Sequence, residues 1–322
     1  MAVSLKSRCL GAIWGTCVAD ALGGPVQFQE PGTFEQIKEL EFVSPFRKPA
    51  GSYSDDGSMT LALAQSIVDT DGKYNHALSI KYYVQWIETG RFSTTDKAWD
   101  VGGSTRRSLK VWKQQGVDNL QGTQEKVNSQ LNRDEFSGNG SLMRIAPIGV
   151  AFWKDPEYAR KVARAQSTIT HPALACPEAC DAFTELICRA MRGQTKEQLC
   201  TAFSRMKFTH PALKNRMANY VTIKDWKAKT AGHITSSGWV VHTLEVALWG
   251  FFRYDSWEKG ALAVVNRGGD SDTAGAVYGA LAGVFYGVDS IPQRWVDGMQ
   301  NAKLIYETAR LFSEAVIANE SG

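Results

Sequence analysis

The sequence lacks the features that mark proteins bound to nucleic acid or to a membrane. Its 36 basic and 33 acidic residues leave a net charge of only +3. Because no basic block is longer than a few residues, we expect neither nucleic acid nor a membrane surface as a partner. The longest uncharged stretch, residues 273–288, falls short of the ~20 residues that span a bilayer. It is predicted to form a core helix.

Several motifs of common enzyme classes are also missing. The chain has no G-x-G-x-x-G, G-x-x-x-x-G-K-[ST], G-x-S-x-G or H-E-x-x-H, so Rossmann, P-loop, α/β-hydrolase and zincin chemistry have no support. Its six cysteines form no C-x-x-C pair, and Cys176 and Cys180 would share one helix face. We expect reduced, mostly buried thiols. Residues 1–24 lack the order of a signal peptide, which favours a cytoplasmic location.

What the sequence does contain is apolar spacing of the helical kind. The hydrophobic fraction of 43% is enough to build a large core, and we expect one domain over residues 1–322. Small residues recur every fourth position at Gly11, Gly15 and Ala19, and again at positions 275, 279 and 283. This pattern predicts two helices that pack closely at the centre. The polar segments 112–135 and 207–236 are predicted to be surface connections.

Two acidic clusters are the strongest chemical signal. Asp55 and Asp56 precede a helix predicted to begin near Ser58, and Asp270 and Asp272 precede another. Helix capping explains one acid of each pair and leaves the second unexplained. If the two helices converge, each pair of carboxylates near 4 Å would cost on the order of 4 kcal/mol, which only protons or metal ions can offset.

The atoms around these acids favour particular metals. Carboxylates together with the hydroxyls of Ser54 and Thr273 form an all-oxygen ligand set, which suits Mg²⁺ or Mn²⁺ better than zinc. Ca²⁺ fits less well because no cage of carbonyl ligands is evident. Capping combined with chance remains the alternative interpretation.

Other segments allow more than one interpretation. Two glycine loops, at 100–106 and 137–144, are suited to bind phosphate through backbone N–H groups, although a simple turn is the favoured interpretation of each loop alone. His171 suits a capping or core role as well as substrate contact. Trp239 suits either packing or stacking on a base or cation. His242 and Glu245 share a helix face and are predicted to form a buried polar pair.

Taken together, these segments resemble the ADP-ribosylglycohydrolase family, and the resemblance covers nearly the whole chain. Its most specific part is GGDSDTAGA in the last of the matching stretches. Those stretches are GAIWGTCVADALGGPVQF (11–28), YSDDGSM (53–59), WDVGGSTRRSL (99–109), GNGSLMRIAPIG (138–149), THP (170–172), SGWVVHTLEVALWGF (237–251) and NRGGDSDTAGAVYGALAG (266–283).

The resemblance implies an all-α, compact orthogonal helical bundle with a central cleft for two Mg²⁺ or Mn²⁺ ions. It implies hydrolysis of ADP-ribose from modified protein side chains or from small-molecule conjugates. The implied metal ligands are Ser54, Asp55, Asp56, Asp270, Asp272 and Thr273. The implied catalytic acids are Asp55, Asp56, Asp100 and Asp272, and the implied substrate contacts are Gln27, Asp100, Gly102, Gly103, Gly138, Asn139, Gly140, His171 and Trp239.

The chain departs from the family pattern at four positions. Gln27 stands where many members carry glutamate, and it cannot supply charge or act as a base. Gly57 stands where threonine is common, Gly103 where asparagine is common, and Trp239 where tyrosine is common. These departures bear on the identity of the substrate more than on metal binding.

Three questions of function stay open at this point. The Ser-Gly-aromatic stretch at 237–239 favours arginine as the modified side chain, with serine or another linkage as alternatives. A helical prenyl-transfer enzyme is disfavoured because Met59 stands where D-D-x-x-D would need its third acid. The remaining rival is an inactive ADP-ribose-binding protein that counteracts a transferase, with Gln27 as the change that removed turnover.

Overall fold

The computed structural model describes residues 3–319, and over that range it contains α-helices and short 3-10 turns but no β-strand. The prediction of an all-α fold is confirmed. The helices are α1 (Leu5–Gly23), α2 (Asp55–Val68), α3 (His76–Thr89), α4 (Gly103–Gln115), α5 (Leu120–Leu131), α6 (Ala146–Ala151), α7 (Pro156–Thr168), α8 (Ala175–Met191), α9 (Lys196–Ser204), α10 (Pro211–Met217), α11 (Ile223–Ala228), α12 (Val240–Arg253), α13 (Trp257–Val265), α14 (Ser271–Tyr286), α15 (Gln293–Asp297) and α16 (Ala302–Ala318).

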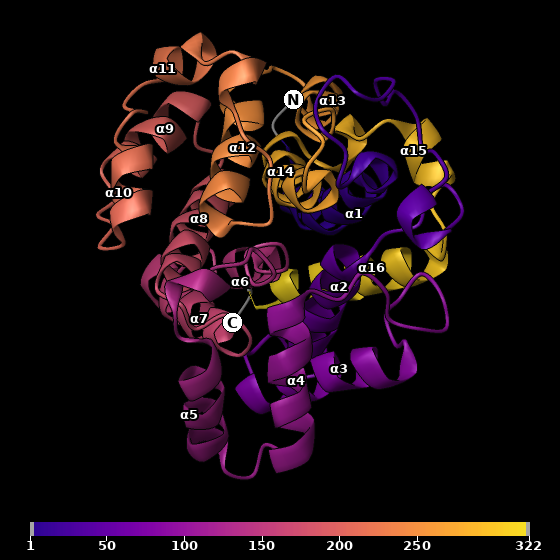
Figure 1. Ribbon diagram of the computed structural model, residues 1–322, viewed down its shortest axis with the longest axis vertical. Helices are drawn as coiled ribbons and strands as arrows, with labels where there is room; N and C mark the ends of the chain where they lie inside the picture. Colours follow the sequence, from indigo (N-terminus) through magenta and orange to yellow (C-terminus); the bar gives the residue numbers. More distant parts are fainter. Residues whose placement is uncertain (1–2, 320–322) are drawn as a thin grey trace.

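Helices α1 and α14 form the centre of the fold and run antiparallel to each other (Figure 1). Their small residues meet: a Cβ on Gly11 would lie 2.1 Å from the carbonyl oxygen of Gly283, and one on Gly15 would lie 2.1 Å from that of Gly279. The two backbones are therefore in contact, as the four-residue spacing of small residues predicts. Larger side chains would force the helices apart.

This antiparallel pairing brings the site residues together. The C-terminal end of α1 meets the N-terminal end of α14, where the hydroxyl of Ser271 donates to the backbone carbonyl of Gly23 at 2.8 Å. The start of α2 reaches the same place, because the backbone N–H of Ser54 donates to the carboxylate of Asp20 near the end of α1. Three helix ends therefore converge on one point.

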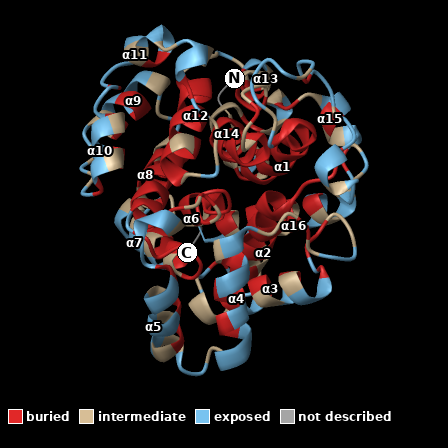
Figure 2. Cartoon of the chain, in the orientation of Figure 1, coloured by how far each residue is buried: buried red, intermediate tan, exposed pale blue. Residues whose placement is uncertain are grey.

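The other helices surround this centre in layers. Helices α2 and α16 pack below the central pair, with α3 and α4 beyond them, while α8 and α12 pack on the other side and α9, α10 and α11 form an outer layer (Figure 1). Buried residues concentrate in α1, α2, α8, α12 and α14, whereas α5 and α9 to α11 bury fewer of their residues and the outer face of α4 is exposed (Figure 2). The convergence point thus lies deep between the layers.

Helix α1 also bears on the question of a membrane. By length and composition, the segment Leu5–Val26 would be long and apolar enough to cross a bilayer, yet 94% of its most apolar window is buried within the molecule. That degree of burial is typical of a core helix.

Some expectations about local structure were wrong. The segment 112–135 contains the whole of α5, and the segment 207–236 contains α10 and α11, so neither is merely a connection. Short amphipathic helices with many polar residues produced this error, because their few buried side chains, such as Trp226, leave a weak periodic signal. Helix α2 begins at Asp55 and not near Ser58, with Ser54 as its N-cap. The two aspartates are therefore inside its first turn.

Candidate active site and metal centre

The carboxylate of Asp20 organises the start of α2. One of its oxygens accepts hydrogen bonds from the backbone N–H groups of Ser54 and Gly57, both at 2.9 Å. Those N–H groups belong to the helix end that lacks intrahelical acceptors. Sequence reasoning did not assign Asp20 a role, although an acid in an otherwise apolar helix was the signal that would have found it. Asp20 thus fixes the position of the first acidic cluster.

Both acids of the first cluster are buried, but only Asp55 lines the cleft. Asp56 is fully buried, and one of its oxygens accepts a hydrogen bond from the Ser54 hydroxyl at 2.9 Å. Asp55 is also buried but lines a cleft open to solvent. Both acids lie in the first turn of α2, where the positive end of the helix dipole stabilises negative charge.

The second cluster meets the first at the start of α14. Asp270 is the N-cap residue of α14, and Asp272 and Thr273 lie in its first turn. The Thr273 hydroxyl lies 3.5 Å from an oxygen of Asp56 and 3.4 Å from one of Asp270, so it bridges the clusters. One carboxylate oxygen each from Asp20, Asp56 and Asp272 lie within 4.8 Å of one another. The two acid pairs therefore converge, as their placement before core helices predicts.

The convergence brings several buried carboxylates so close together that their negative charges would repel one another strongly. Burial, and then the neighbouring carboxylates, raise the pKa of Asp55 and of Asp272 well above the ordinary aspartate value. Burial also raises the pKa of Asp20 to about 7, against the opposing effect of its backbone hydrogen bonds. Within residues 3–319, none of these carboxylates forms an ion pair with a basic side chain. No basic side chain among the described residues therefore compensates this negative charge.

The donor atoms fit divalent cations. One oxygen each of Asp56 and Asp272 is buried with no hydrogen-bond partner, and so is one of Asp100. Buried polar atoms are nearly always paired, so such a group of unpaired oxygens indicates an ion. Carboxylate and hydroxyl oxygens are the ligands that Mg²⁺ and Mn²⁺ prefer. The residues present therefore suit the predicted metal centre.

Asp100 lies at the edge of this centre, directly before α4. Its backbone is in the left-handed region, with φ of 56°, which aspartate tolerates better than most residues. Burial raises its pKa to about 6, opposed by the nearby side chains of Asp272 and Gln27. Gln27 is 1% exposed, and its amide nitrogen has no hydrogen-bond partner. Asp20, with its pKa of about 7, does not line the cleft, whereas Asp100 does, so Asp100 is the acid placed to exchange a proton with a bound ligand.

The glycine loop at 137–144 forms one wall of the cleft. Its backbone pairs with the start of α12 through a bridge between Gly138 and Trp239. The side-chain amide of Asn139 donates to Asp270 and, at 2.8 Å, to the hydroxyl of Thr243. Gly140 has no room for a side chain, because a Cβ there would lie 2.7 Å from the ring of His171. This wall is therefore tied directly to the metal centre.

A buried arginine that sequence reasoning did not assign supports the same wall. Arg144 is fully buried and donates to the carbonyl oxygen of Gly140 and to the hydroxyl of Thr170, each at 2.8 Å. Thr170 in turn contacts Nδ1 of His171 at 2.8 Å. Burial, and then the charge of Arg144, lower the pKa of His171 to about 3. His171 consequently faces the cleft as a neutral imidazole.

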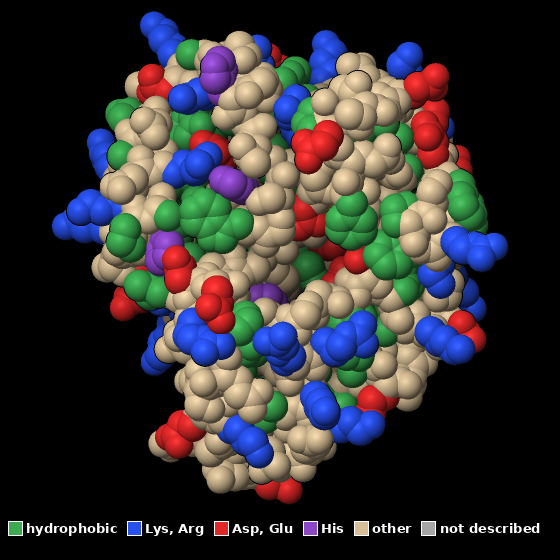
Figure 3. Space-filling model, viewed as in Figure 1, with side chains coloured by type: hydrophobic (Ala, Val, Ile, Leu, Met, Phe, Trp, Pro, Cys, Tyr) green, Lys and Arg blue, Asp and Glu red, His purple; other side chains and the backbone are tan. Residues whose placement is uncertain are grey.

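The cleft itself has a volume of about 320 Å³, within the range of small-molecule sites. Figure 3 shows acidic atoms in the floor of a hollow near the middle of the molecule. Among the predicted site residues, those that line it are Asp55, Asp100, Gly102, Gly103, Gly138, Asn139, Gly140, His171, Asp270, Asp272 and Thr273. Ser54, Asp56, Gln27 and Trp239 lie behind or beside this lining. The lining residues that were not assigned a role individually are Phe28, Val101, Ser104, Thr105, Met143 and Gly238, and four of these lie in the two glycine loops at 100–106 and 137–144.

Two aromatic residues belong to the segments that form the cleft. Phe28 lines it with 66% of its surface exposed and a left-handed φ of 67°, which is strained for an aromatic residue. Its backbone N–H donates to the carbonyl oxygen of Gly269, next to Asp270, at 2.6 Å. The ring of Trp239 packs edge-on against His242, with centroids 4.8 Å apart. Both aromatic residues are therefore anchored to segments that build the site.

The predicted pair of His242 and Glu245 does not form. His242 contacts the hydroxyl of Ser237 at 2.8 Å, whereas Glu245 accepts hydrogen bonds from Arg216 and Tyr220 at 2.6 and 2.5 Å. Arg216 lies in α10, which the sequence did not predict to be helical, and Tyr220 follows three residues after the end of that helix. The spacing of His242 and Glu245 on one helix face could therefore not predict these contacts of Glu245.

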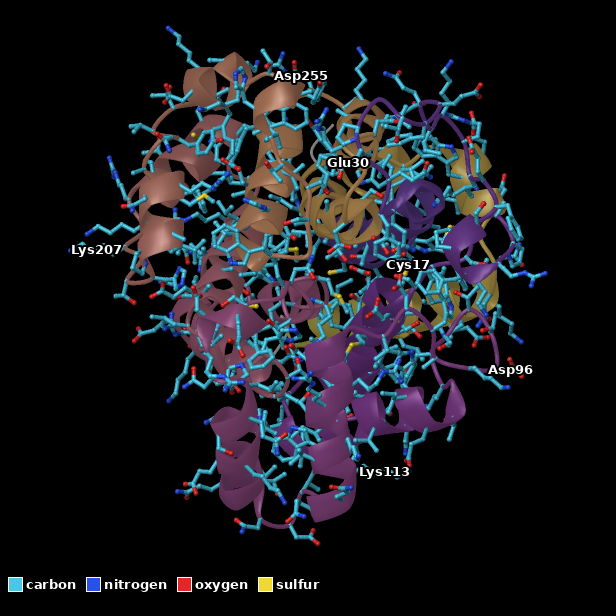
Figure 4. The ribbon with its side chains drawn as sticks, viewed as in Figure 1. Cys17, Glu30, Asp96, Lys113, Lys207 and Asp255 are labelled. Carbon is cyan, nitrogen blue, oxygen red and sulfur yellow. The ribbon has the colours of Figure 1, made fainter. Side chains whose placement is uncertain are left out.

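All six cysteines are buried and none is in a disulfide, which agrees with the expectation of core thiols. Cys17 lies on α1 one turn before Asp20 and near the middle of the molecule (Figure 4). Burial, and then Asp20 and Asp56, raise its pKa well above the ordinary thiol value. Cys176 donates from α8 to the carbonyl oxygen of Gly138 at 3.2 Å. These thiols support the site from behind.

Comparison with known proteins gives a consistent result. The family model for ADP-ribosylglycohydrolase matches residues 1–321. The chain is 30% identical to the ADP-ribosylarginine hydrolase Tri1 of Pseudomonas putida, over 97% of this chain and 80% of that one. It is 27% identical to the ADP-ribosyl-[dinitrogen reductase] glycohydrolase of Rhodospirillum rubrum, over 91% and 90% of the two chains.

A solved structure described as an ADP-ribosylglycohydrolase-related protein complex superposes with a TM-score of 0.79 at 30% identity, covering 97% of this chain and 99% of the other. Together with the family match over almost the whole sequence, this agreement extends from local motifs to the complete helical architecture. The chain belongs to the ADP-ribosylglycohydrolase family of glycosyl-bond hydrolases.

Proposed function

We propose that this protein hydrolyses the N-glycosidic bond between ADP-ribose and an arginine side chain, and that it requires two Mg²⁺ or Mn²⁺ ions to do so. The observation that carries the proposal is the convergence of buried carboxylates around Asp20, Asp56 and Asp272 without a basic partner. Bound cations would offset the repulsion among these carboxylates, and helix capping alone does not explain why so many acids converge.

The choice of arginine is supported by relatives. The Tri1 proteins of Pseudomonas putida and Serratia proteamaculans, 30% and 27% identical to this chain, are both named ADP-ribosylarginine hydrolases. The cleft adds a physical argument, since the exposed Phe28 ring stands at its mouth and aromatic faces attract a guanidinium group. Serine and glutamate linkages are the alternatives that an assay must include.

The ions would be held by Ser54, Asp55, Asp56, Asp270, Asp272 and Thr273. When bound, they would supply Lewis-acid chemistry by orienting ribose hydroxyls and by acidifying water. Asp20 would act from behind by fixing the start of α2 through its hydrogen bonds to Ser54 and Gly57.

The single domain over residues 1–322 and the choice between Mg²⁺ and Mn²⁺ remain predictions.

The chain's own residues suggest how the bond is broken. The glycine loops with Gly102, Gly138 and Gly140 offer backbone groups to the ADP-ribose, and the neutral His171 borders it. Water adds to the anomeric carbon, the carbon–nitrogen bond breaks, and the departing guanidine nitrogen takes up a proton. Asp100, with its pKa raised to about 6, is placed to relay that proton. The cluster of carboxylates favours the positive charge that develops at the anomeric carbon.

The test is release of ADP-ribose from arginine-, serine- and glutamate-modified proteins with Mg²⁺, with Mn²⁺ and with EDTA. We expect metal-dependent release from the arginine linkage and none from an Asp270→Ala/Asp272→Ala variant. Release from the serine or glutamate linkage alone would correct the substrate. Binding of ADP-ribose without release from any linkage would instead support the inactive binding protein, and would make Gln27 the decisive departure.

We further infer a cytoplasmic protein that acts on an ADP-ribosylated protein or a small conjugate, without nucleic acid or membrane as a partner. The six cysteines, all buried and none in a disulfide, support a reducing compartment. The balanced net charge of +3 supports the absence of a nucleic-acid partner.

A further inference from the structure

The outer face of α4 carries an unusual charge pattern. Its exposed cations are Arg106, Arg107, Lys110 and Lys113, which together we call the α4 basic face. Between Asp100 and Asp118 the sequence contains no acid at all. Figure 3 shows basic side chains along the lower lip of the hollow, and Figure 4 places Lys113 toward the far end of α4. The face spans ~10 Å along the helix, from Arg106 to Lys113.

This arrangement opposes the intrinsic preference of a helix. Helix α4 has no acid in its first turn and no side-chain cap, although negative charge is favoured at a helix N-terminus. Arg106 and Arg107 instead place two positive charges there. A negatively charged group outside the helix would compensate these positive charges and so explain why they stand there.

The chain itself provides little compensation. Lys113 pairs with Glu88, and the Arg107 guanidinium lies over the ring of Phe136 at 5.4 Å. Within residues 3–319, Arg106 and Lys110 have no ion-pair partner. Two of the four cations are thus available to an external partner.

The position of the face identifies that partner. The residues just before it, Gly103, Ser104 and Thr105, line the cleft, whereas the four cations lie outside the lining and are exposed to solvent. A side chain that delivers ADP-ribose into the cleft remains attached to its protein, so the surface of that protein must lie against the lip. The cations therefore face the substrate protein and not the ADP-ribose.

We propose that the α4 basic face binds acidic residues flanking the modified arginine of the substrate protein, an inference that rests on the proposed function. Complementary charge at the rim of an interface mainly accelerates association and selects among partners. The face therefore makes this hydrolase prefer modified arginines in acidic surroundings. It leaves the chemistry at the anomeric carbon unchanged.

The test compares ADP-ribosylarginine as a free conjugate with peptides that carry the same group between glutamates or between lysines. Hydrolysis rates and peptide binding by fluorescence anisotropy are measured for the wild type and for Arg106→Glu/Lys110→Glu. The matched control, Lys224→Glu/Lys227→Glu, makes the same charge change on exposed residues of the distant helix α11. Glutamate near the start of α4 suits the helix dipole, so the double variant keeps its fold, which the melting temperature verifies.

We expect the wild type to favour the glutamate peptide, and the α4 variant to lose about fivefold or more of kcat/KM and affinity for it. The free conjugate and the control variant should be unaffected. An equal loss on the free conjugate would assign these cations to ADP-ribose and overturn the proposal.

An α4 variant that prefers the glutamate peptide as strongly as the α11 control variant does would also overturn the proposal. So would a wild type that binds a single-stranded oligonucleotide and shows no preference between the two peptides. If no substrate were hydrolysed, the proposed function would fail, while the anisotropy data would still decide whether the face selects acidic peptides.

Discussion

The carboxylate of Asp20 accepts a hydrogen bond from the backbone N–H of Gly57 at 2.9 Å, across 37 positions of sequence. The same oxygen accepts from the N–H of Ser54. This contact joins the end of α1 to the start of α2 and so determines where the first pair of aspartates lies. The proposed metal centre consequently depends on a residue that need not be a ligand.

Replacing Asp20 tests that dependence. Asp20→Ala leaves two buried N–H groups without an acceptor and should lower the free energy of unfolding by about 2–4 kcal/mol. Asp20→Asn retains an acceptor oxygen and should lower it much less. Urea denaturation measures both. If Asp20 only positions the cluster, Asp20→Asn still shows a rise in melting temperature with Mn²⁺, whereas loss of that rise would make Asp20 a ligand.

Removing one charge from the cluster should have opposite effects with and without metal. Asp272→Asn relieves repulsion among the carboxylates and should stabilise the metal-free protein by on the order of 1–4 kcal/mol. It should also abolish the rise in melting temperature that Mg²⁺ or Mn²⁺ gives the wild type. Differential scanning fluorimetry checks both effects, with the exposed Asp118→Asn as control. A variant that is less stable without metal would argue against electrostatic crowding.

The neutrality of His171 predicts a pH dependence of stability. The pKa of His171 in the folded protein, about 3, lies below the ordinary histidine value of about 6.5. The contribution of the neutral imidazole to the free energy of unfolding is therefore complete above pH 6.5. As the pH falls from 6.5 toward 3, His171 binds a proton in the unfolded chain but not in the folded protein. Stability is then lost by up to about 1.4 kcal/mol per pH unit.

His171→Gln should reduce that slope, measured by urea denaturation at pH 7, 6 and 5. An identical slope in the variant would mean that His171 already accepts a proton in the folded protein. The histidine would then lie closer to the charged state than its burial beside Arg144 implies.

The contact of α1 with α14 predicts a large effect from a single methyl group. A Cβ at Gly279 would lie 2.1 Å from the carbonyl oxygen of Gly15, so Gly279→Ala should cost about 3 kcal/mol or more. Gly232→Ala is the control, since nothing lies within 4 Å of a Cβ there. Chemical denaturation that found the two variants equally stable would contradict the close approach of these helices.

The sequence predicted the centre of this molecule better than its periphery. The stripes of small residues through Gly15 and Gly279 led to the central helix pair, and the placement of Asp56 and Asp272 before core helices led to their convergence. Both arguments use strict spacing within long apolar helices, where pattern and structure are tightly linked.

Other parts required the three-dimensional structure. The role of Asp20 arises from a contact with Gly57 that no local pattern encodes. Arg144 supports His171 through Thr170, which a sequence cannot reveal because the three meet only when α7 packs near the glycine loop. Phe28 was missed because its exposure at the cleft results from a strained backbone. Helices such as α5 were missed because they bury too few residues to show a period.

The measurement that tests the central claim most directly is ADP-ribose release from ADP-ribosylarginine by protein freed of metal with EDTA and then dialysed. Mg²⁺ or Mn²⁺ is titrated back while released ADP-ribose is quantified by chromatography. We predict no release from the metal-free protein and recovery that saturates at two ions per chain. Full activity of the metal-free protein would contradict the account, because the buried carboxylates would then perform the reaction without the ions that their convergence calls for.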